Sequence, residues 1–421
     1  MSPPLLLLLC AAVFAFCLRI LRWPVPFALV LTALVGGVVG TAGFPFRHLV
    51  EGAFGYLNLI LALFAGAWFG QAARHAGLTE GFAHGLLRLC RGRPVAVLAV
   101  VGTLLFAAGA SSGVAGVAVL TIGAFAAPAL ARIGLQAHQA AAFIAVEATC
   151  GMIAPPVNVP AMMIADGVNM PFLNFDRALL VLSLPVALFA VAWFAARARR
   201  PETVVQPGAL APWRVVHGFS PLALVLGFWL VLRLFPQHVY DPGVPIVLVI
   251  GGLVALPALG RAGARSGAHD TFAGVPLYLA AVLVGVGMLV QIMTLTGMRG
   301  WVVMQAMASE APWLQLLVVS LPLIGGVLTS AGTSNVLGVP FAFAFIDQDM
   351  IINVAALSSI AAIAEFMPPT AVGAALSGYV VGEANLWKIL RASVWPVAFL
   401  FALSMTLLVF ARPLARFLTG T

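Results

Sequence analysis

Long apolar segments separated by short polar loops make up most of this chain. A run of about twenty apolar residues is long enough to cross the hydrocarbon core of a bilayer as a helix. Such runs lie near residues 3–21, 24–43, 54–73 and 178–196, and again near residues 218–235, 243–260, 274–296 and 388–411. The pattern therefore predicts an all-α polytopic membrane protein.

Two other apolar regions are divided by uncharged bends. Residues 94–131 bend at Gly109-Ala110-Ser111-Ser112-Gly113, and residues 312–346 bend at Thr329-Ser330-Ala331-Gly332-Thr333-Ser334-Asn335. The arms are short for membrane spans, and small or hydroxylated residues favour a turn. We therefore expect two re-entrant hairpins whose tips lie inside the membrane, each preceded by an amphipathic segment.

Two further apolar segments are each interrupted by a pair of prolines. Pro155-Pro156 divides residues 138–170, and Pro368-Pro369 divides residues 351–382. Proline lacks the backbone donor and clashes with the carbonyl one turn back, so each pair stops a helix. Inside a bilayer, the freed backbone groups are tolerated only where protein or a wet cavity satisfies them. Matched breaks in two halves of a chain are a sequence pointer to the binding site of a transporter.

The order of these elements recurs on both sides of a polar stretch at residues 198–217. We therefore predict two repeats, 1–197 and 218–421, joined by a cytoplasmic connector. If each hairpin begins and ends on one side of the membrane, each repeat has five crossings. An odd number of crossings makes the second repeat inverted relative to the first.

Composition and charge agree with this topology. The chain is 62% hydrophobic and 8% charged, with a mean hydropathy of +1.10. The net charge of +8 does not indicate nucleic acid, because the basic residues lie in short loops between apolar spans. Placing the loop of Arg19 and Arg22 in the cytoplasm follows the positive-inside rule and puts both termini outside. The basic residues then left outside are Arg47, Arg177, Arg233, Arg299, Arg412 and Arg416.

Other functional classes find little support in the residues. Cys10, Cys17, Cys90 and Cys150 lack metal or redox spacing, so we interpret them as packing residues. A membrane enzyme acting on lipid needs a nucleophile with a base, or a metal cluster, and the sequence offers no such constellation. We therefore expect a transporter rather than an enzyme.

The bends and breaks contain groups suited to ions. Hydroxyl, amide and free carbonyl oxygens are ligands for a hard monovalent cation, and helix N-termini after a bend suit an anionic substrate group. Small residues can also serve only close helix packing, but the duplication favours a site. The candidate substrate-binding residues are Ser111, Ser112, Pro155, Pro156, Asn158, Thr333, Ser334, Pro369 and Thr370.

Two carboxyl groups, Glu147 and Glu365, lie deep in apolar segments shortly before the double prolines. A carboxylate at such a position is costly unless it is paired, protonated or wet, so it suggests function. Each could carry a proton or contribute to a cation site. The alternative is a carboxyl that caps the freed backbone of the break, and the residues do not decide between these roles.

Several segments resemble the large membrane subunit of tripartite ATP-independent periplasmic (TRAP) transporters, in the ion transporter superfamily. They are Trp23-Pro24-Val25-Pro26-Phe27-Ala28-Leu29, the amphipathic segment 78–89, the Gly109 to Gly113 tip and the run from Gly151 to Pro160. The resemblance implies an elevator-type carrier of the bacterial inner membrane that imports an organic anion, carboxylate or dicarboxylate, with sodium. It also implies two partners, a periplasmic substrate-binding protein and a small four-span membrane subunit.

Carried over residue by residue, the resemblance implies sodium ligands at the tips and breaks. These are Gly109, Ser112, Gly113, Gly151, Gly332, Thr333, Asn335 and Met367. The second bend, Thr329 to Asn335, is more similar to the Ser-Asn-containing tips of divalent-anion/sodium symporters, which need no binding protein. The alternative function is therefore a self-sufficient sodium- or proton-coupled anion symporter.

Overall fold

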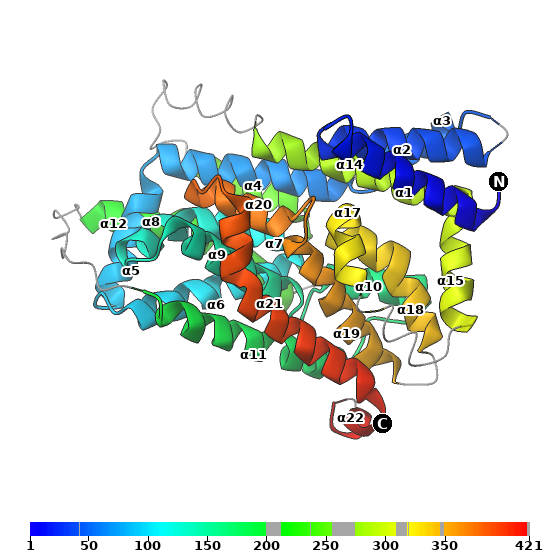
Figure 1. The fold of residues 1–421 in the computed structure, drawn as a ribbon. Coiled ribbons are helices and arrows are strands. Elements are labelled where there is room, and N and C mark those ends of the chain that lie inside the picture. Colours follow the sequence, from blue (N-terminus) through cyan, green and yellow to red (C-terminus); the bar gives the residue numbers. More distant parts are fainter. Residues whose placement is uncertain are drawn as a thin grey trace.

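The computed structural model describes residues 1–41, 43–198, 212–235, 237–254, 274–308, 318, 320–345 and 349–418. In this part of the chain every regular element is a helix (Figure 1). Six of these helices are long and apolar enough to cross a membrane, and one bent pair would make a seventh. The chain is thus an all-helical, multi-pass membrane protein, as the apolar pattern predicts.

The first half follows the predicted segment boundaries, but the arms of the predicted hairpin, Pro94–Ser112 and Ala115–Arg132, are long and apolar enough to cross a membrane, whereas Pro3–Arg19 and Val25–Gly40 are shorter apolar helices. The helices of the first half are α1 (Pro3–Arg19), α2 (Val25–Gly40), α3 (Phe46–Phe54), α4 (Leu57–His75), α5 (Leu78–Leu89), α6 (Pro94–Ser112), α7 (Ala115–Ala118), α8 (Ala124–Arg132), α9 (Ala137–Met152), α10 (Val159–Gly167) and α11 (Asp176–Ala195). A π-helical turn at Val119–Gly123 joins α7 to α8. The pattern did not resolve α3, which is bent by 41° from α4 and carries polar residues.

The second half contains α12 (Pro212–Leu234), a helix at Val244–Val254, α14 (Val275–Leu295), α15 (Met298–Ala308), α17 (Leu321–Thr333), α18 (Val339–Ala344), α19 (Met350–Ala362), α20 (Val372–Val381), α21 (Leu386–Val409) and α22 (Ala411–Leu418). A π-helical turn at Ser334–Gly338 joins α17 to α18, and a 3₁₀ turn at Ile363–Phe366 follows α19.

The predicted connector, 198–217, needs a correction at its end. Helix α12 already begins at Pro212, because proline suits the first helical position, where its missing N–H costs nothing. Most of the connector, residues 199–211, lies outside the described residues, as do the last part of the predicted span 243–260 and the first arm of the predicted hairpin 312–346 before residue 318.

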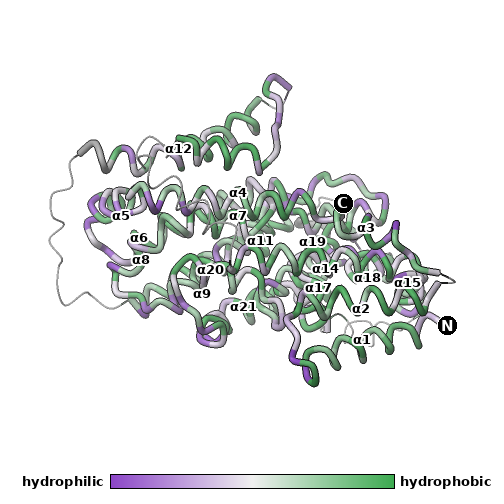
Figure 2. The backbone as a smooth tube through the Cα atoms, turned by 90° about the horizontal axis from the view of Figure 1, so that it is seen from above, coloured by the Kyte–Doolittle hydropathy of each residue, from purple (hydrophilic) through white to green (hydrophobic). Residues whose placement is uncertain are grey.

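Helices from both halves of the sequence pack side by side. α14 lies against α2 and α3, while α9 packs against α6, α11, α20 and α21. In Figure 1, α2, α3, α4 and α14 form one long side of the molecule and α6, α11 and α21 form the other. Figure 2 shows that hydrophilic residues gather at peripheral turns, for example beside α5, while the central helices are apolar.

The two broken segments are packed crosswise. α9, which precedes the first break, packs against α20, which follows the second break; α10 packs against α19 in the converse arrangement. Nearly every residue of α9 from Ala140 to Met152, and of α19 from Ile352 to Ala362, is buried. Helices that are apolar on all sides belong in the centre of a bundle, and their small residues allow close approach.

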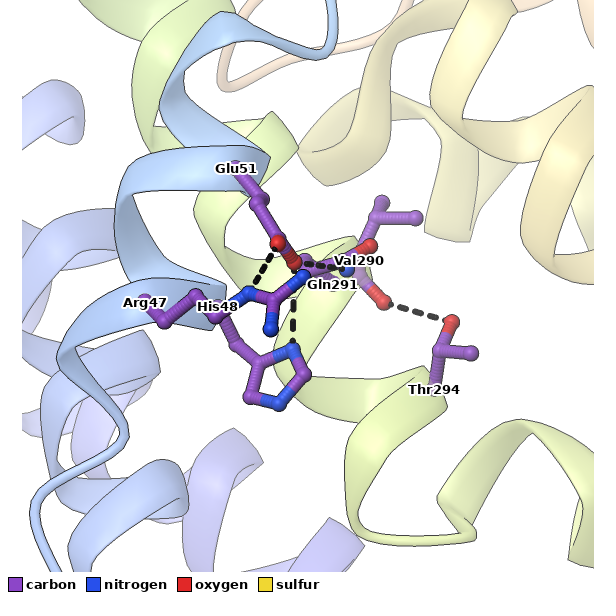
Figure 3. A network of polar contacts seen from close by, with 6 residues as sticks. All are labelled: Arg47, His48, Glu51, Val290, Gln291 and Thr294. Carbon is purple, nitrogen blue, oxygen red and sulfur yellow. Dashed lines mark hydrogen bonds and ion pairs between the residues drawn. The ribbon is translucent and has the colours of Figure 1, made fainter.

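A polar network fastens α3 to α14 (Figure 3). The Glu51 carboxylate accepts hydrogen bonds from Arg47 Nε at 2.7 Å and from Gln291 Nε2 at 3.3 Å. Next to it, the two helices cross at Gly52 and Gly287, where a β-carbon on Gly52 would lie 2.6 Å from the Gly287 carbonyl oxygen. Small residues thus bring the two backbones together, and the network fixes their register.

The arms of the first hairpin and the first broken segment also meet through glycines. A β-carbon on Gly109 of α6 would lie 2.8 Å from the Ala148 carbonyl oxygen of α9 and 2.8 Å from the Gly151 α-carbon. Such contacts are shorter than real β-carbons make, so a side chain at either glycine must push the helices apart.

We expect Gly109→Ala to lower the apparent melting temperature of the purified protein, because overpacking a tight helix crossing costs about 1–3 kcal/mol. Gly227→Ala on α12 is the matched control, since nothing lies within 4 Å of a β-carbon there. The control should be neutral or slightly stabilising, because alanine favours the helix. Equal melting temperatures for Gly109→Ala and the unmodified chain would contradict the close crossing.

Candidate functional site

The turn of the first hairpin is narrower than the sequence suggests. Helix α6 continues through Gly109 to Ser112, and only Gly113, with φ 69°, and Val114 leave the helical conformation. The hydroxyls of Ser111 and Ser112 each donate to the carbonyl four residues earlier, at 2.7 Å. These bonds are compatible with a helix, which continues through most of the predicted bend and ends at Ser112.

The second hairpin turns at one residue. Thr329, at the beginning of the predicted bend, adopts φ 63° and ψ 173°, while Gly332 and Thr333 are already helical and Ser334 and Asn335 lie in the π-helical turn. The hydroxyls of Thr333 and Ser334 donate to the carbonyls of Thr329 and Ser330, at 2.6 and 2.9 Å. A positive φ is rare for a β-branched residue, and such backbone outliers cluster at functional sites.

Each double proline breaks its helix as predicted. The gaps run from Ile153 to Asn158 and from Met367 to Ala371, and both Pro-Pro peptide bonds are cis. The residue after each pair is tied to the adjacent hairpin. The Val157 N–H donates to the Ala110 carbonyl at 3.2 Å, and the Thr370 N–H donates to the Gly326 carbonyl at 3.0 Å.

These two hydrogen bonds occupy corresponding places. Ala110 lies three residues before the positive-φ residue Gly113, and Gly326 lies three residues before Thr329. The Thr370 hydroxyl adds a second bond to the Gly326 carbonyl, at 2.8 Å. Both breaks are therefore held against the first arm of a hairpin by the same kind of contact.

Asn158 is a fully buried cap. Its Oδ1 accepts from the Ala161 N–H at 2.9 Å, and its Nδ2 donates to the Ile153 carbonyl at 3.0 Å and to Ser358 Oγ at 3.3 Å. The Asn158 amide thus supplies hydrogen-bond partners to backbone groups that the first break frees, and it links that break to α19. These bonds give Asn158 a structural role in addition to the binding role that we predicted.

One cavity lies where both bends meet the residues that flank both breaks. It contains about 610 Å³ of space not filled by atoms, including the part open to the outside. Its walls come from α4, α14 and α20, from the two bends, and from residues on either side of the two breaks. The lining residues are Leu59, Leu63, Gly113, Val114, Ala115, Gly116, Val117, Met152, Val159, Pro160, Leu283, Thr329, Ser330, Ala331, Glu365, Val372 and Leu376.

Four helical segments begin at the wall of this cavity. They start at Ala115 and Ser330, just after the two bends, and at Val159 and Val372, just after the two breaks. The first amides of a helix have no partner within the helix, and a helix N-terminus acts as about half a positive charge. The lining residues include no Lys, Arg or His, so these backbone dipoles are the positive groups at the cavity.

Polar side chains occupy one corner of the cavity. Ser330 Oγ donates to Glu365 Oε1 at 2.5 Å, and the Gly373 N–H faces the same carboxyl group. Thr329 Oγ1 is buried without a hydrogen-bond partner among the described residues, and so is Glu365 Oε2. The Glu365 carboxyl therefore lies both beside the start of α20, after the second break, and at the cavity wall.

Glu147 lies elsewhere. Its side chain is buried against α6, where a β-carbon on Gly102 would be 3.2 Å from its carboxyl carbon, and its Oε1 has no partner among the described residues. It is absent from the cavity wall. The two glutamates thus occupy unlike environments, and they also lie at unequal offsets, eight and three residues, before the first proline of their pairs.

The structure gathers only part of the predicted site. Gly113 lines the cavity, whereas Ser111, Ser112, Thr333, Ser334 and Asn335 lie in the flanking helices, and Pro155, Pro156, Met367, Pro369 and Thr370 form the breaks behind the wall. Gly109, Gly151 and Gly332 lie at helix contacts. The sequence did not predict Val114 to Val117 or the four leucines that line the cavity, Leu59, Leu63, Leu283 and Leu376, as site residues. The positions directly after each break signal a helix start, but no sequence signal separates these leucines from those that face lipid.

Comparisons with protein-family models and with curated proteins find no match to this sequence. The residue pattern and the geometry of the cavity therefore carry the functional conclusion.

Proposed function

We propose that this chain is a secondary transporter that moves an organic anion across the membrane together with sodium. The observation that carries the proposal is the meeting of two bends and two broken helices at one cavity, with four helix starts in its wall. Irregular backbone is tolerated at membrane depth where it lines a cavity, and transporters place their substrates at such broken helices.

The helix starts support an anionic substrate. Backbone amides and helix dipoles bind anionic groups without a basic side chain. Two of the four helix starts already have a protein side chain beside their amides, because Asn158 caps α10 and the Glu365 carboxyl faces the Gly373 amide of α20. The starts after the two bends have no such side-chain cap among the described contacts, and we place the anionic group of the substrate there.

Several oxygens near the bends suit sodium, which is a second substrate of the proposed cycle. The hydroxyls of Ser112, Thr333 and Ser334 donate to backbone carbonyls, yet each oxygen keeps lone pairs that a cation can use. Both returning arms also contain a π-helical turn, at Val119–Gly123 and Ser334–Gly338. Such turns are frequent at functional sites. Asn335 is half-buried within the second turn.

The two halves form inverted repeats in this proposal. The matching hydrogen bonds from Val157 and Thr370 and the crosswise packing of the broken segments support it. The hairpins and broken helices move as a unit, and α1 to α4 with α14 form the static frame, as in an elevator. As the resemblance to TRAP transporters implies, a secreted binding protein and a small four-span subunit of the bacterial inner membrane complete the system.

A polar contact joins the proposed frame to the proposed moving unit. Gln71 Nε2 on α4 donates to Tyr379 Oη on α20 at 2.7 Å, and Arg74 Nη1 donates to the Val380 carbonyl at 3.2 Å. In an elevator these bonds hold one of the two end states, because they must break when α20 slides past α4.

Uptake of organic acids into proteoliposomes containing the purified chain, with and without a binding protein, tests the proposed function. We expect uptake that collapses when potassium replaces sodium. Asn335→Ala should raise the sodium concentration needed for half-maximal uptake, because the amide oxygen is lost, with little change in melting temperature. Thr103→Ala is the control, since that hydroxyl is exposed on α6 and bonds only to its own helix. Uptake that is equal in potassium would overturn the assignment of the coupling ion.

Tyr379→Phe should change the rate of transport while leaving the fold intact. A single hydrogen bond contributes about 0.5–1.5 kcal/mol, so its loss shifts the balance between the two end states by about two- to tenfold. Tyr240→Phe is the matched control, because Tyr240 is 85% exposed. Cysteine cross-linking between α4 and α20 in vesicles measures the shift. An unchanged cross-linking yield would show that this contact does not hold an end state.

A further inference from the structure

The cavity wall has one polar corner and a large apolar remainder. Among its lining residues only Thr329, Ser330 and Glu365 have polar side chains. The opposite walls are built by leucines on three different helices, Leu59 and Leu63 of α4, Leu283 of α14 and Leu376 of α20. A ligand that fills this space therefore meets polar groups at one end and hydrocarbon along the rest of its length.

The polar end is defined by the two bends. The starts at Ala115 and Ser330 lack a side-chain cap among the described contacts, and Thr329 Oγ1 is buried with no partner there. A carboxylate placed between the bends accepts hydrogen bonds from the first amides of both helices and from this hydroxyl. This position lies in the described wall beside the residues that follow both bends and beside the unpartnered Thr329 hydroxyl.

The apolar part of the cavity disfavours a ligand that carries a second charged group. A dicarboxylate would place its other carboxylate against the leucines, where it loses water and finds no donor. The hydroxyls of a sugar acid would be left without partners in the same way. Aliphatic or aromatic carbon instead gains from contact with these walls.

We propose that the substrate is a monocarboxylate with an apolar body, such as a branched aliphatic or an aromatic acid. This inference rests on the proposed function and narrows it, because it excludes the dicarboxylate class. The Thr329 hydroxyl orients the head group, and the four leucines select the body.

An apolar amine is the competing chemistry, because Glu365 lies at the same corner. The Glu365 carboxyl already accepts from Ser330 and faces the Gly373 amide, so it serves the protein's own backbone. The helix starts, in addition, repel a cation. The amine is therefore included in the test as an outcome that contradicts the proposal.

The test is direct binding to the full chain in lipid nanodiscs containing sodium, by titration calorimetry. The probes are 4-methylpentanoate, phenylacetate, succinate, gluconate and 4-methylpentylamine, each up to about 10 mM, which detects even weak sites. We expect the two apolar acids to bind at least about tenfold more tightly than succinate or gluconate, a ratio that one added contact of this kind can supply.

Wall variants locate the binding site. Leu63→Ala should weaken binding of 4-methylpentanoate by about tenfold, because the acid loses apolar contact. Leu61→Ala on the same helix is the matched control, since Leu61 is 48% exposed and is absent from the wall, and it should leave binding unchanged. Leu59→Ala, at a half-buried wall position, provides the same comparison if Leu63→Ala lowers the melting temperature.

The outcomes separate the two proposals. Tighter binding of succinate or gluconate overturns the apolar monocarboxylate and leaves anion transport intact. Tighter binding of the amine, or no binding of any acid, overturns both. Equal losses in Leu61→Ala and in the wall variants would show that the acid binds outside this cavity.

Discussion

The structure depends on how it satisfies the backbone that two double prolines set free inside an apolar bundle. Each break leaves N–H and carbonyl groups that water cannot reach, and an unpaired buried group is costly. In this protein, the carbonyls of Ala110 and Gly326 in the neighbouring hairpins accept hydrogen bonds from the breaks, and side chains such as Asn158 and Glu365 lie against other freed groups. A hairpin and its break are thereby tied into one unit, and the open helix ends that remain are directed at a shared cavity.

This requirement also explains where small residues lie. Gly109 and Gly151 bring the first hairpin within hydrogen-bonding reach of its break, and Gly326 does the same for the second, because a side chain there would overlap the backbone opposite. The hydroxyls that flank the bends serve their own helices and still offer lone pairs. A residue at these positions can therefore serve both helix packing and ligand binding. The close approach of the helices also brings the hydroxyl and carbonyl oxygens of the bends near one another.

Much of the architecture could be read from the sequence, and the details of the site could not. The spans, the amphipathic segment 78–89 and both breaks follow from apolar run length and from proline chemistry. The predicted bends contain the actual turns but are too wide, because Ser111 and Ser112 can bond within a helix and Thr329 turns against the preference of a β-branched residue. Leu59, Leu63 and Leu376 resemble every other leucine of their helices, and only the tertiary packing decides which of them face the cavity.

The crosswise packing of the broken segments has a consequence for biosynthesis. Asn158 reaches Ser358 across 200 positions of sequence, and α9 and α10 are covered by α20 and α19. When the first half alone has been made, its broken helix lacks these neighbours, although its own residues already bond the freed backbone. A chain stopped before residue 350 would leave the apolar faces of α9 and α10 that α20 and α19 cover without their partners.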